Sequence, residues 1–271
     1  MKVKTGVCSV SVLAVGMLLT GSCFSFRGAR IKGDGNVEAR EITIRDYDAV
    51  RVQGGSMKVD YRQSDDAPGL TVTVDRNIFE MYRFEVHDGE LIIEPKEEYK
   101  HDRFVPTQFT VVTNSTGLRR VKAAGRVEYT VGSPLRTEEL NFSLAGGTKV
   151  DLKNAVVLRK LEVKIAGSGT LNLPALTGET FESDIAGSGR MNLGGEVARA
   201  SFEIAGSGTV HAFDLQAGEV KCKIAGSGYV EASANNSLQA EIAGSGDIRY
   251  RGNPQQVNTN VAGSGKVRKA D

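Results

Sequence analysis

The 271-residue sequence contains no tryptophan, six prolines and three cysteines, and aromatic residues make up only 6% of it. The cysteines (Cys8, Cys23 and Cys222) are too few for a disulfide framework, so packing must hold the fold together. Charge of one sign is also lacking, because 34 basic residues offset 33 acidic ones and leave a formal net charge of +1. This balance argues against general nucleic-acid binding, and no nucleic-acid partner is expected.

Glycine, by contrast, is abundant. The chain has 32 glycines, about 12% of its residues against roughly 7% in average proteins. The scarcity of proline and the absence of glycine at every third position exclude a collagen-like chain. Simple disorder is excluded too, because 40% of the residues are hydrophobic and the net charge is near zero. The positions of the glycines therefore decide the fold.

Residues 1–22 are predicted to be a secretory signal peptide. A short basic start precedes an apolar run over residues 7–19, which is shorter than the roughly 20 residues that a membrane-spanning helix needs. The segment LLTGSC at 18–23 resembles the lipobox of bacterial lipoproteins. This resemblance implies cleavage before Cys23 and acylation of its thiol; the alternative is a secreted protein with an unmodified cysteine. Residues 23–36 are expected to form a flexible tether.

The tetrapeptide Ala-Gly-Ser-Gly occurs six times, at intervals of 18 to 20 residues. Apolar and polar residues alternate on both sides of each copy, which is typical of half-buried strands. A fixed period of this length indicates a solenoid, in which equivalent strands of successive coils run parallel. The glycines would form the corners, where the backbones approach closely and φ is positive. The predicted corner residues are Gly167, Gly169, Gly187, Gly189, Gly206, Gly208, Gly226, Gly228, Gly244, Gly246, Gly263 and Gly265.

We therefore predict an all-β fold, a parallel β-solenoid (β-helix) with coils of about 20 residues. The regular repeats occupy residues 116–271, where two weaker copies of the corner precede the six clear ones. Residues 37–115 lack the clean repeat and are predicted to form irregular β coils that cap the open end of the stack. Residues 37–271 are expected to form one continuous domain.

Side chains suited to catalysis or metal binding are scattered along the sequence. His87 falls beside a turn, His101 in a charged loop and His211 at an outward strand position. Cys222 falls in an inward apolar column and is interpreted as a core residue. Gly-Ser-Gly matches neither a nucleophile elbow nor a phosphate-binding loop. No catalytic residue, metal site or cofactor is predicted.

Several segments resemble the head GIN domain family of auto-transporter adhesins, which is found in Gram-negative cell envelopes. The resemblance is carried by the Ala-Gly-Ser-Gly corners and by residues 45–52, 72–78, 85–93 and 250–254, and it covers roughly residues 40–269. It implies a right-handed β-helical stack and an adhesive role. It implies no catalytic residues.

These observations lead to one preferred function and two alternatives. The preferred function is a non-catalytic envelope protein, anchored through Cys23 to a membrane that we expect to be the outer membrane, on either of its sides. Its solenoid would be a rigid binding or scaffold module for a protein or glycan ligand. The first alternative is a glycan-binding or carbohydrate-active β-helix, although Tyr229 is the only aromatic residue that directly follows a corner. The second alternative is a partner in envelope-stress signalling.

Overall fold

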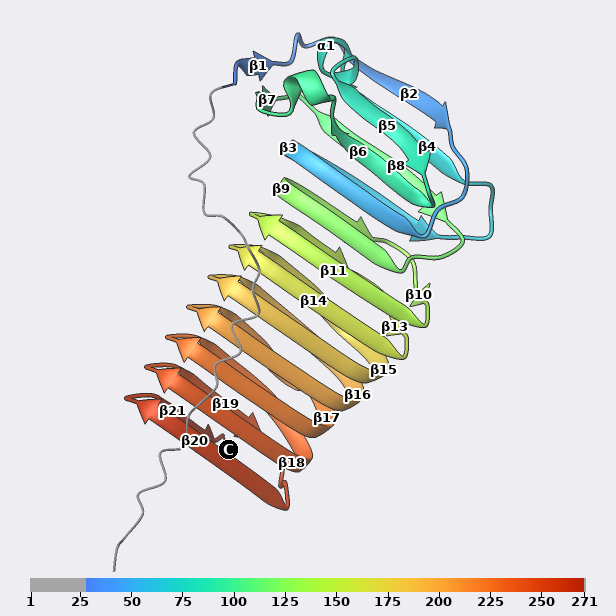
Figure 1. Cartoon of the computed structure of the whole chain (residues 1–271). Coiled ribbons are helices and arrows are strands. Elements are labelled where there is room, and N and C mark those ends of the chain that lie inside the picture. The colour runs from blue at the N-terminus through green and yellow to red at the C-terminus, as the bar shows by residue number, and fades with distance from the viewer. Residues whose placement is uncertain (1–27, 271) are drawn as a thin grey trace, which may run out of the picture.

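The computed structural model describes residues 28–270 and is dominated by β-structure, with 72% strand and almost no helix. The strands build a parallel β-solenoid of about eight turns, which confirms the predicted fold class (Figure 1). The predicted signal peptide (1–22) and Cys23 lie outside the described residues. Within residues 28–270, no helix is long and apolar enough to cross a membrane.

The regular coils descend from β9 to β21 in Figure 1. Each coil has one strand before the corner glycines, a second strand after them and a return segment, and in the middle of the stack these merge into long bent strands. Equivalent residues pair in parallel register, as at Ile185, Ile204 and Ile224. The bounds are β9 Arg120–Val131, β10 Leu135–Arg136, β11 Glu139–Gly146, β12 Lys149–Leu152, β13 Val156–Val157, β14 Lys160–Gly167, β15 Thr170–Gly187, β16 Arg190–Gly206, β17 Thr209–Gly226, β18 Tyr229–Gly244, β19 Asp247–Arg251, β20 Gln256–Gly263 and β21 Lys266–Lys269.

The unequal length of the repeats is absorbed in the return segments and not at the corners. Between β15 and β16 the register shifts after Leu173, and between β16 and β17 it shifts after Asn192. On the corner side the pairing continues residue by residue up to the first glycine of the tetrapeptide. The corners are therefore the fixed points of the stack, and differences of one to three residues between neighbouring coils are accommodated on the opposite side.

The core lies between the two rows of strands and is filled by the inward positions that the alternation predicts. One fully buried column follows the corners and consists of Val150, Leu171, Met191, Val210, Val230 and Ile248. A second column, on the strands before the corners, contains Phe142, Phe202 and the buried Cys222. Burying each large apolar side chain stabilises the fold by about 1.5–3 kcal/mol, so the continuous columns explain stability without disulfides.

The N-terminal part departs from the predicted irregular coils. Strand β3 is a true first coil, because its residues 49–54 pair parallel and in register with residues 120–125 of β9. The other strands form antiparallel pairs, β2 with β4, β4 with β8 and β5 with β6, which close the upper end of the stack (Figure 1). The bounds are β2 Val37–Thr43, β3 Ala49–Gln63, β4 Gly69–Asp75, α1 Arg76–Phe79, β5 Tyr82–His87, β6 Glu90–Pro95, the 3-10 helix Glu97–Tyr99 and β8 Phe109–Ser115.

The tether expected over residues 23–36 is shorter than the sequence suggests. Strand β1 (Arg30–Lys32) pairs parallel with β7 (Arg103–Val105), which fixes the incoming chain on the cap. The buried carboxylate of Asp75 accepts hydrogen bonds from the backbone N–H groups of Gly35 and Thr107, at 3.0 and 2.7 Å. Burial alone would raise the pKa of Asp75, but these hydrogen bonds hold it below its ordinary value. Residues 28–36 thus belong to the folded body.

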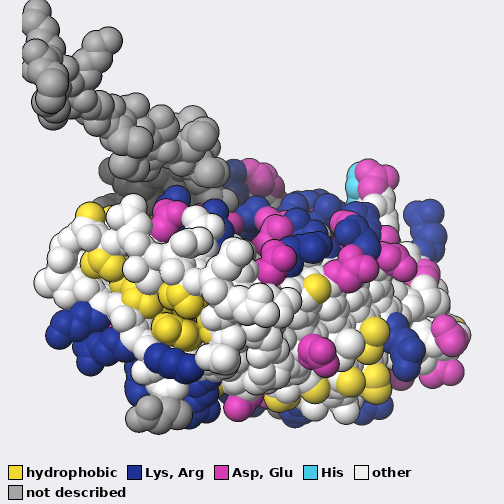
Figure 2. Space-filling view, turned by 90° about the horizontal axis from the view of Figure 1, so that it is seen from below, with side chains coloured by type: hydrophobic (Ala, Val, Ile, Leu, Met, Phe, Trp, Pro, Cys, Tyr) yellow, Lys and Arg dark blue, Asp and Glu magenta, His cyan; other side chains and the backbone are white. Residues whose placement is uncertain are grey.

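The lower end of the stack is open. No described residue covers strand β20, all of whose residues are exposed. Its Val257 and Val261 stand at the positions that are inward in earlier coils, yet they are 41% and 40% exposed. Figure 2 looks at the molecule from below and shows hydrophobic side chains at the surface. Among residues 28–270, the two ends of the solenoid therefore differ: one is capped and receives the N-terminal segment, and the other is left uncovered.

Candidate functional site

The first glycines of the tetrapeptides stack in one column along an edge of the solenoid, and Gly206 shows why glycine is required there. Its φ is 127°, a conformation that L side chains rarely adopt. The carbonyl oxygen of Gly187, in the coil above, accepts a hydrogen bond from the Ser207 N–H at 2.9 Å. A Cβ on Gly206 would lie 2.6 Å from the same oxygen. This glycine therefore protects the hydrogen bond that joins two coils.

The second glycine of the tetrapeptide has a different role. Gly208 has an ordinary φ, and a Cβ there would lie 2.8 Å from the Cγ2 methyl of Ile185. Gly208 is therefore required because a side chain there would collide with a core residue, and not because its backbone conformation is unusual. The serines between the two glycines are exposed, and one hydroxyl-to-hydroxyl hydrogen bond joins them in the described residues, from Ser264 to Ser245 at 3.1 Å. The corner edge thus presents small, uncharged side chains.

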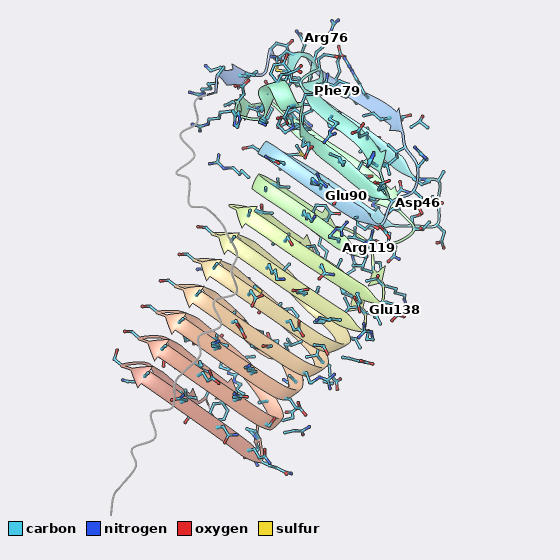
Figure 3. All side chains as sticks on the ribbon, viewed as in Figure 1. Asp46, Arg76, Phe79, Glu90, Arg119 and Glu138 are labelled. Atoms are coloured by element: carbon cyan, nitrogen blue, oxygen red, sulfur yellow. The ribbon has the colours of Figure 1, made fainter. Side chains whose placement is uncertain are left out.

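A charged hollow of about 350 Å³ lies where the cap meets the first coils. Its floor holds Glu90, whose side chain is only 8% exposed, and Figure 3 shows this residue on the cap beside the upper coils. The Arg51 guanidinium donates a hydrogen bond to the Glu90 carboxylate, and Arg120 lies 3.7 Å from its other oxygen. Arg83 reaches the hollow from β5, where it pairs with Glu94. Carboxylate and guanidinium groups therefore alternate around one opening.

This hollow has unused hydrogen-bonding capacity. Glu90 Oε1 and Arg120 Nε are buried and have no hydrogen-bond partner among the described residues. Burying a polar group without a partner costs about 1–3 kcal/mol, so the hollow is a place where added polar contacts would be favourable. The charged residues of the hollow lie on four strands, β3, β5, β6 and β9. Arg51 and Arg120 are about 70 positions apart in the sequence. No local sequence motif indicates this hollow, and it was not predicted from the sequence.

A second polar cluster lies on an outward column of the later coils. His211 Nδ1 is 2.8 Å from Glu231 Oε2, and the Tyr229 hydroxyl donates a hydrogen bond to Glu231 Oε1 at 2.7 Å. Burial tends to raise the pKa of Glu231, but the hydrogen bonds from His211 and Tyr229 leave it below its ordinary value. The predicted register places His211 beside Glu231, so the pattern of the repeats contained the signal for this pair.

The other candidate residues are not brought together. His87 and His101 lie at different hollows, and each is exposed. Cys222 is completely buried, and burial raises the pKa of its thiol to about 12, which makes it a poor nucleophile. Within residues 28–270, no group of three or more His, Cys, Asp or Glu side chains is arranged to hold a metal ion.

The family described as "putative auto-transporter adhesin, head GIN domain" matches residues 46–254. The chain belongs to this family. The matched region thus spans the cap from β3 onward and most of the coils, and the adhesin family indicates a protein of the cell envelope or the cell exterior. No curated protein matches the chain.

Solved structures with the same fold include three proteins from Parabacteroides. A protein of Parabacteroides distasonis named "putative lipid binding protein" is 37% identical, with 89% of this chain and 100% of that chain covered and a TM-score of 0.86. A "putative adhesin" from Parabacteroides merdae is 32% identical, with 89% and 99% covered and a TM-score of 0.83. Another "putative adhesin", from Parabacteroides distasonis, is 33% identical, with 89% and 100% covered and a TM-score of 0.82. The head GIN domain of this chain therefore shares its fold with proteins named for adhesion and for lipid binding.

Proposed function

We propose that this head GIN domain protein is a lipid-anchored envelope protein whose solenoid is a non-catalytic, adhesive binding or scaffold module. The observation that carries the proposal is the position at which the chain enters the fold. Strand β1 is tied to the capped end, so an anchor at Cys23 would hold that end near the membrane. About eight turns spaced by about 4.8 Å would then extend roughly 38 Å away from it.

This arrangement suits display of a surface better than it suits catalysis. The coils are short and continuous, and the Gly-Ser-Gly corners leave no long loops on their edge from which a deep cleft is usually built. The strand faces present long ladders of polar side chains in fixed register, such as Asn172 and Asn192, whose amides are hydrogen-bonded at 2.6 Å. A rigid ladder of this kind binds a repetitive ligand at little entropic cost.

Two experiments test the proposal. Cells that express the protein are labelled with a radioactive fatty acid, and labelling should be abolished by Cys23→Ala; unchanged labelling would contradict the anchor. Separately, the mature chain from residue 23 is applied to arrays of glycans and host-matrix proteins. Binding to a matrix component would support an adhesive function. Absence of binding on the arrays, together with a protein partner recovered in a pull-down, would contradict adhesion and favour a scaffold function.

The charged hollow around Glu90 favours a second candidate function, the binding of a polar glycan. Sugar hydroxyls both donate and accept hydrogen bonds, so they suit an opening in which carboxylates and guanidinium groups alternate. Arg83→Gln should then lower the affinity for any glycan found on the array, because this guanidinium faces the hollow and is 42% exposed. Arg159→Gln is a matched control, since Arg159 is also half-exposed and paired with a glutamate, but on a distant coil.

A further inference from the structure

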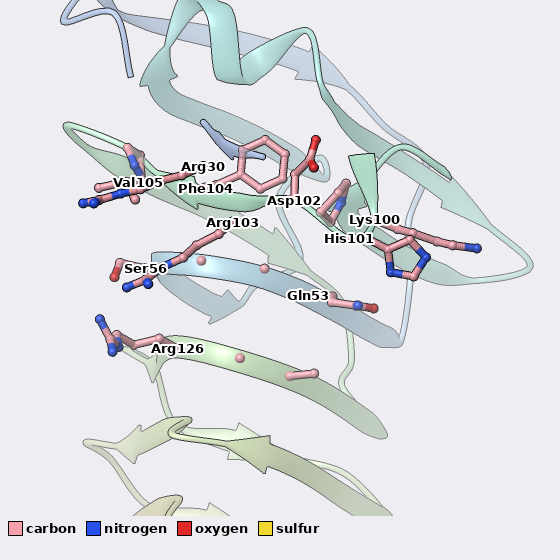
Figure 4. Close-up of a pocket in the computed structure, with 16 residues that line it drawn as sticks. Arg30, Gln53, Ser56, Lys100, His101, Asp102, Arg103, Phe104, Val105 and Arg126 are labelled. Atoms are coloured by element: carbon pink, nitrogen blue, oxygen red, sulfur yellow. The ribbon is translucent and has the colours of Figure 1, made fainter. Parts of the chain in front are cut away.

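A larger hollow, of about 530 Å³, lies where the β1–β7 strap crosses the corner edge of the first two coils. Figure 4 shows Arg30, Arg103 and Arg126 on one side of it, with their guanidinium groups pointing the same way. All three are exposed, and none forms an ion pair with a described residue. The acid in the lining, Asp102, accepts a hydrogen bond from the Ala29 N–H and points away from the arginines.

The arrangement of these arginines is unfavourable without an anion. Arg30 and Arg103 are direct register partners in the parallel β1–β7 pair. Like charges at directly paired positions destabilise a sheet, and no described acid offsets them. Arg126 adds a third cation at a position where every later coil has glycine or serine. A row that is otherwise small and uncharged becomes cationic only at the end that receives the N-terminal segment.

The length of chain before the hollow indicates what it faces. Cys23 and Arg30 are seven residues apart in the sequence, and seven extended residues span at most about 25 Å. An acyl chain on Cys23 would therefore keep the backbone of Arg30 within about that distance of the membrane surface, and Arg103 and Arg126 line the same hollow as Arg30. Guanidinium groups bind phosphate oxygens in a bidentate manner, so lipid headgroup phosphates match this cluster in charge and geometry.

We propose that Arg30, Arg103 and Arg126 form a docking surface for anionic lipid headgroups of the membrane that carries the anchor. This inference rests on the proposed lipid anchor and gives it a second, electrostatic contact. A lipid chain combined with a basic patch anchors a protein more stably than a single acyl chain alone. The contact also favours one orientation, in which the end of the solenoid that carries the β1–β7 pair faces the headgroups.

The test uses the mature chain from residue 23 with Cys23→Ser, so that no acyl group contributes. It retains every described contact, because the described fold begins at residue 28. Binding is measured by co-sedimentation with vesicles of phosphatidylcholine, with and without phosphatidylglycerol. One variant replaces the three arginines with glutamine. The control variant replaces Lys266, Arg268 and Lys269, which removes the same charge at the open end of the solenoid.

We expect binding only to the vesicles that contain phosphatidylglycerol. The triple arginine variant should bind about 100-fold more weakly, since each basic residue near an anionic surface contributes about fivefold. The control variant should bind nearly as well as the unsubstituted chain, and its thermal unfolding should change little because its side chains are exposed. Thermal unfolding of the arginine variant should be unchanged or shift slightly upward, because the substitution removes the like charges at the paired positions Arg30 and Arg103. Equal losses in the two variants, binding to pure phosphatidylcholine, or no binding to anionic vesicles would each overturn the inference.

Two further measurements separate the sources of phosphate and the two proposals. Titration with inorganic phosphate at constant ionic strength should show no saturable site. Tight binding of free phosphate would instead indicate that the arginines bind a soluble anion, and it would overturn the membrane-docking proposal. The fatty-acid labelling of Cys23 reports on the anchor alone. Labelled Cys23 without a preference for anionic vesicles contradicts only the docking surface, whereas unlabelled Cys23 contradicts the anchor whatever the vesicles show.

Discussion

Replacing the two glycines of one corner by alanine should have different effects on stability. Gly206→Ala places a side chain at a φ of 127° and a Cβ 2.6 Å from the carbonyl oxygen of Gly187. The backbone conformation costs about 1–3 kcal/mol, and the overpacking costs about 1–3 kcal/mol more. The atom displaced is the one that accepts the Ser207 N–H, so the hydrogen bond between the coils is weakened as well. We expect a loss of about 2–6 kcal/mol.

Gly208→Ala should cost less, because its φ is ordinary and the nearest atom is a side-chain methyl of Ile185 at 2.8 Å. Overpacking of about 1–3 kcal/mol is partly offset by the 0.4–1 kcal/mol or so that alanine gains by restricting the unfolded chain. Gly147 provides the control, since it also lies in a corner but a Cβ there would meet nothing within 4 Å. Gly147→Ala should be neutral or slightly stabilising.

The three variants are compared by urea unfolding followed by far-UV circular dichroism. A solenoid can unfold in segments, so midpoints are compared only among variants with the same slope as the unsubstituted chain. The expected order of stability is Gly147→Ala, then Gly208→Ala, then Gly206→Ala. If Gly206→Ala unfolds at the same urea concentration as Gly147→Ala, neither positive φ nor the contact with the neighbouring coil holds the stack together, and the explanation of the repeats is wrong.

Three further predictions concern titratable groups. Burial raises the pKa of the Cys222 thiol to about 12, so a disulfide reagent should modify it only after denaturation, and rapid modification of the native protein would contradict the packed core. Burial and then the charge of Glu203 raise the pKa of Asp184, so its ionised form is disfavoured by folding. Asp184→Asn should therefore stabilise the protein by about 0.2–1 kcal/mol near neutral pH, and urea midpoints should show the gain disappear at acid pH. The pKa of Glu231 is lowered, so its contribution is present above the ordinary carboxyl pKa and is lost as the pH falls through the lowered value; Glu231→Gln should flatten that part of the stability profile.

The sequence predicts the solenoid because corners and strands are local features. Each tetrapeptide marks a corner by itself, and the alternation beside it tells which side chains point inward. The parallel register follows from matching one corner to the next, which places His211 beside Glu231. The distinct roles of Gly206 and Gly208 do not follow in the same way, because they depend on which atoms of the neighbouring coil each glycine faces.

The sequence predicts a cap over residues 37–115, but the antiparallel pairing of its strands and its charged hollow were beyond prediction for a different reason. Antiparallel pairs such as β2 with β4 join segments without a repeat, so nothing in the sequence states which strands meet. The Glu90 carboxylate finds its guanidinium partners about 30 to 40 residues away on either side, and only the assembled sheet brings them together. The arginine cluster is an intermediate case, since Arg126 breaks the corner row visibly in the sequence, whereas the pairing of Arg30 with Arg103 appears only in the structure.

The distribution of charge along the corner edge has a consequence for where an adhesive ligand would bind. If the cationic end lies on the membrane, the neutral Gly-Ser-Gly row rises from it, and the strand faces of the later coils are the surfaces that remain accessible. In that orientation the charged hollow, which opens beside the cap, would lie near the membrane and would suit a ligand of the envelope itself. The open end, where Val257 and Val261 are exposed, lies farthest away. A long partner outside the envelope should therefore contact the later coils, and substitutions in the outward column that contains His211 should weaken adhesion more than Arg83→Gln does.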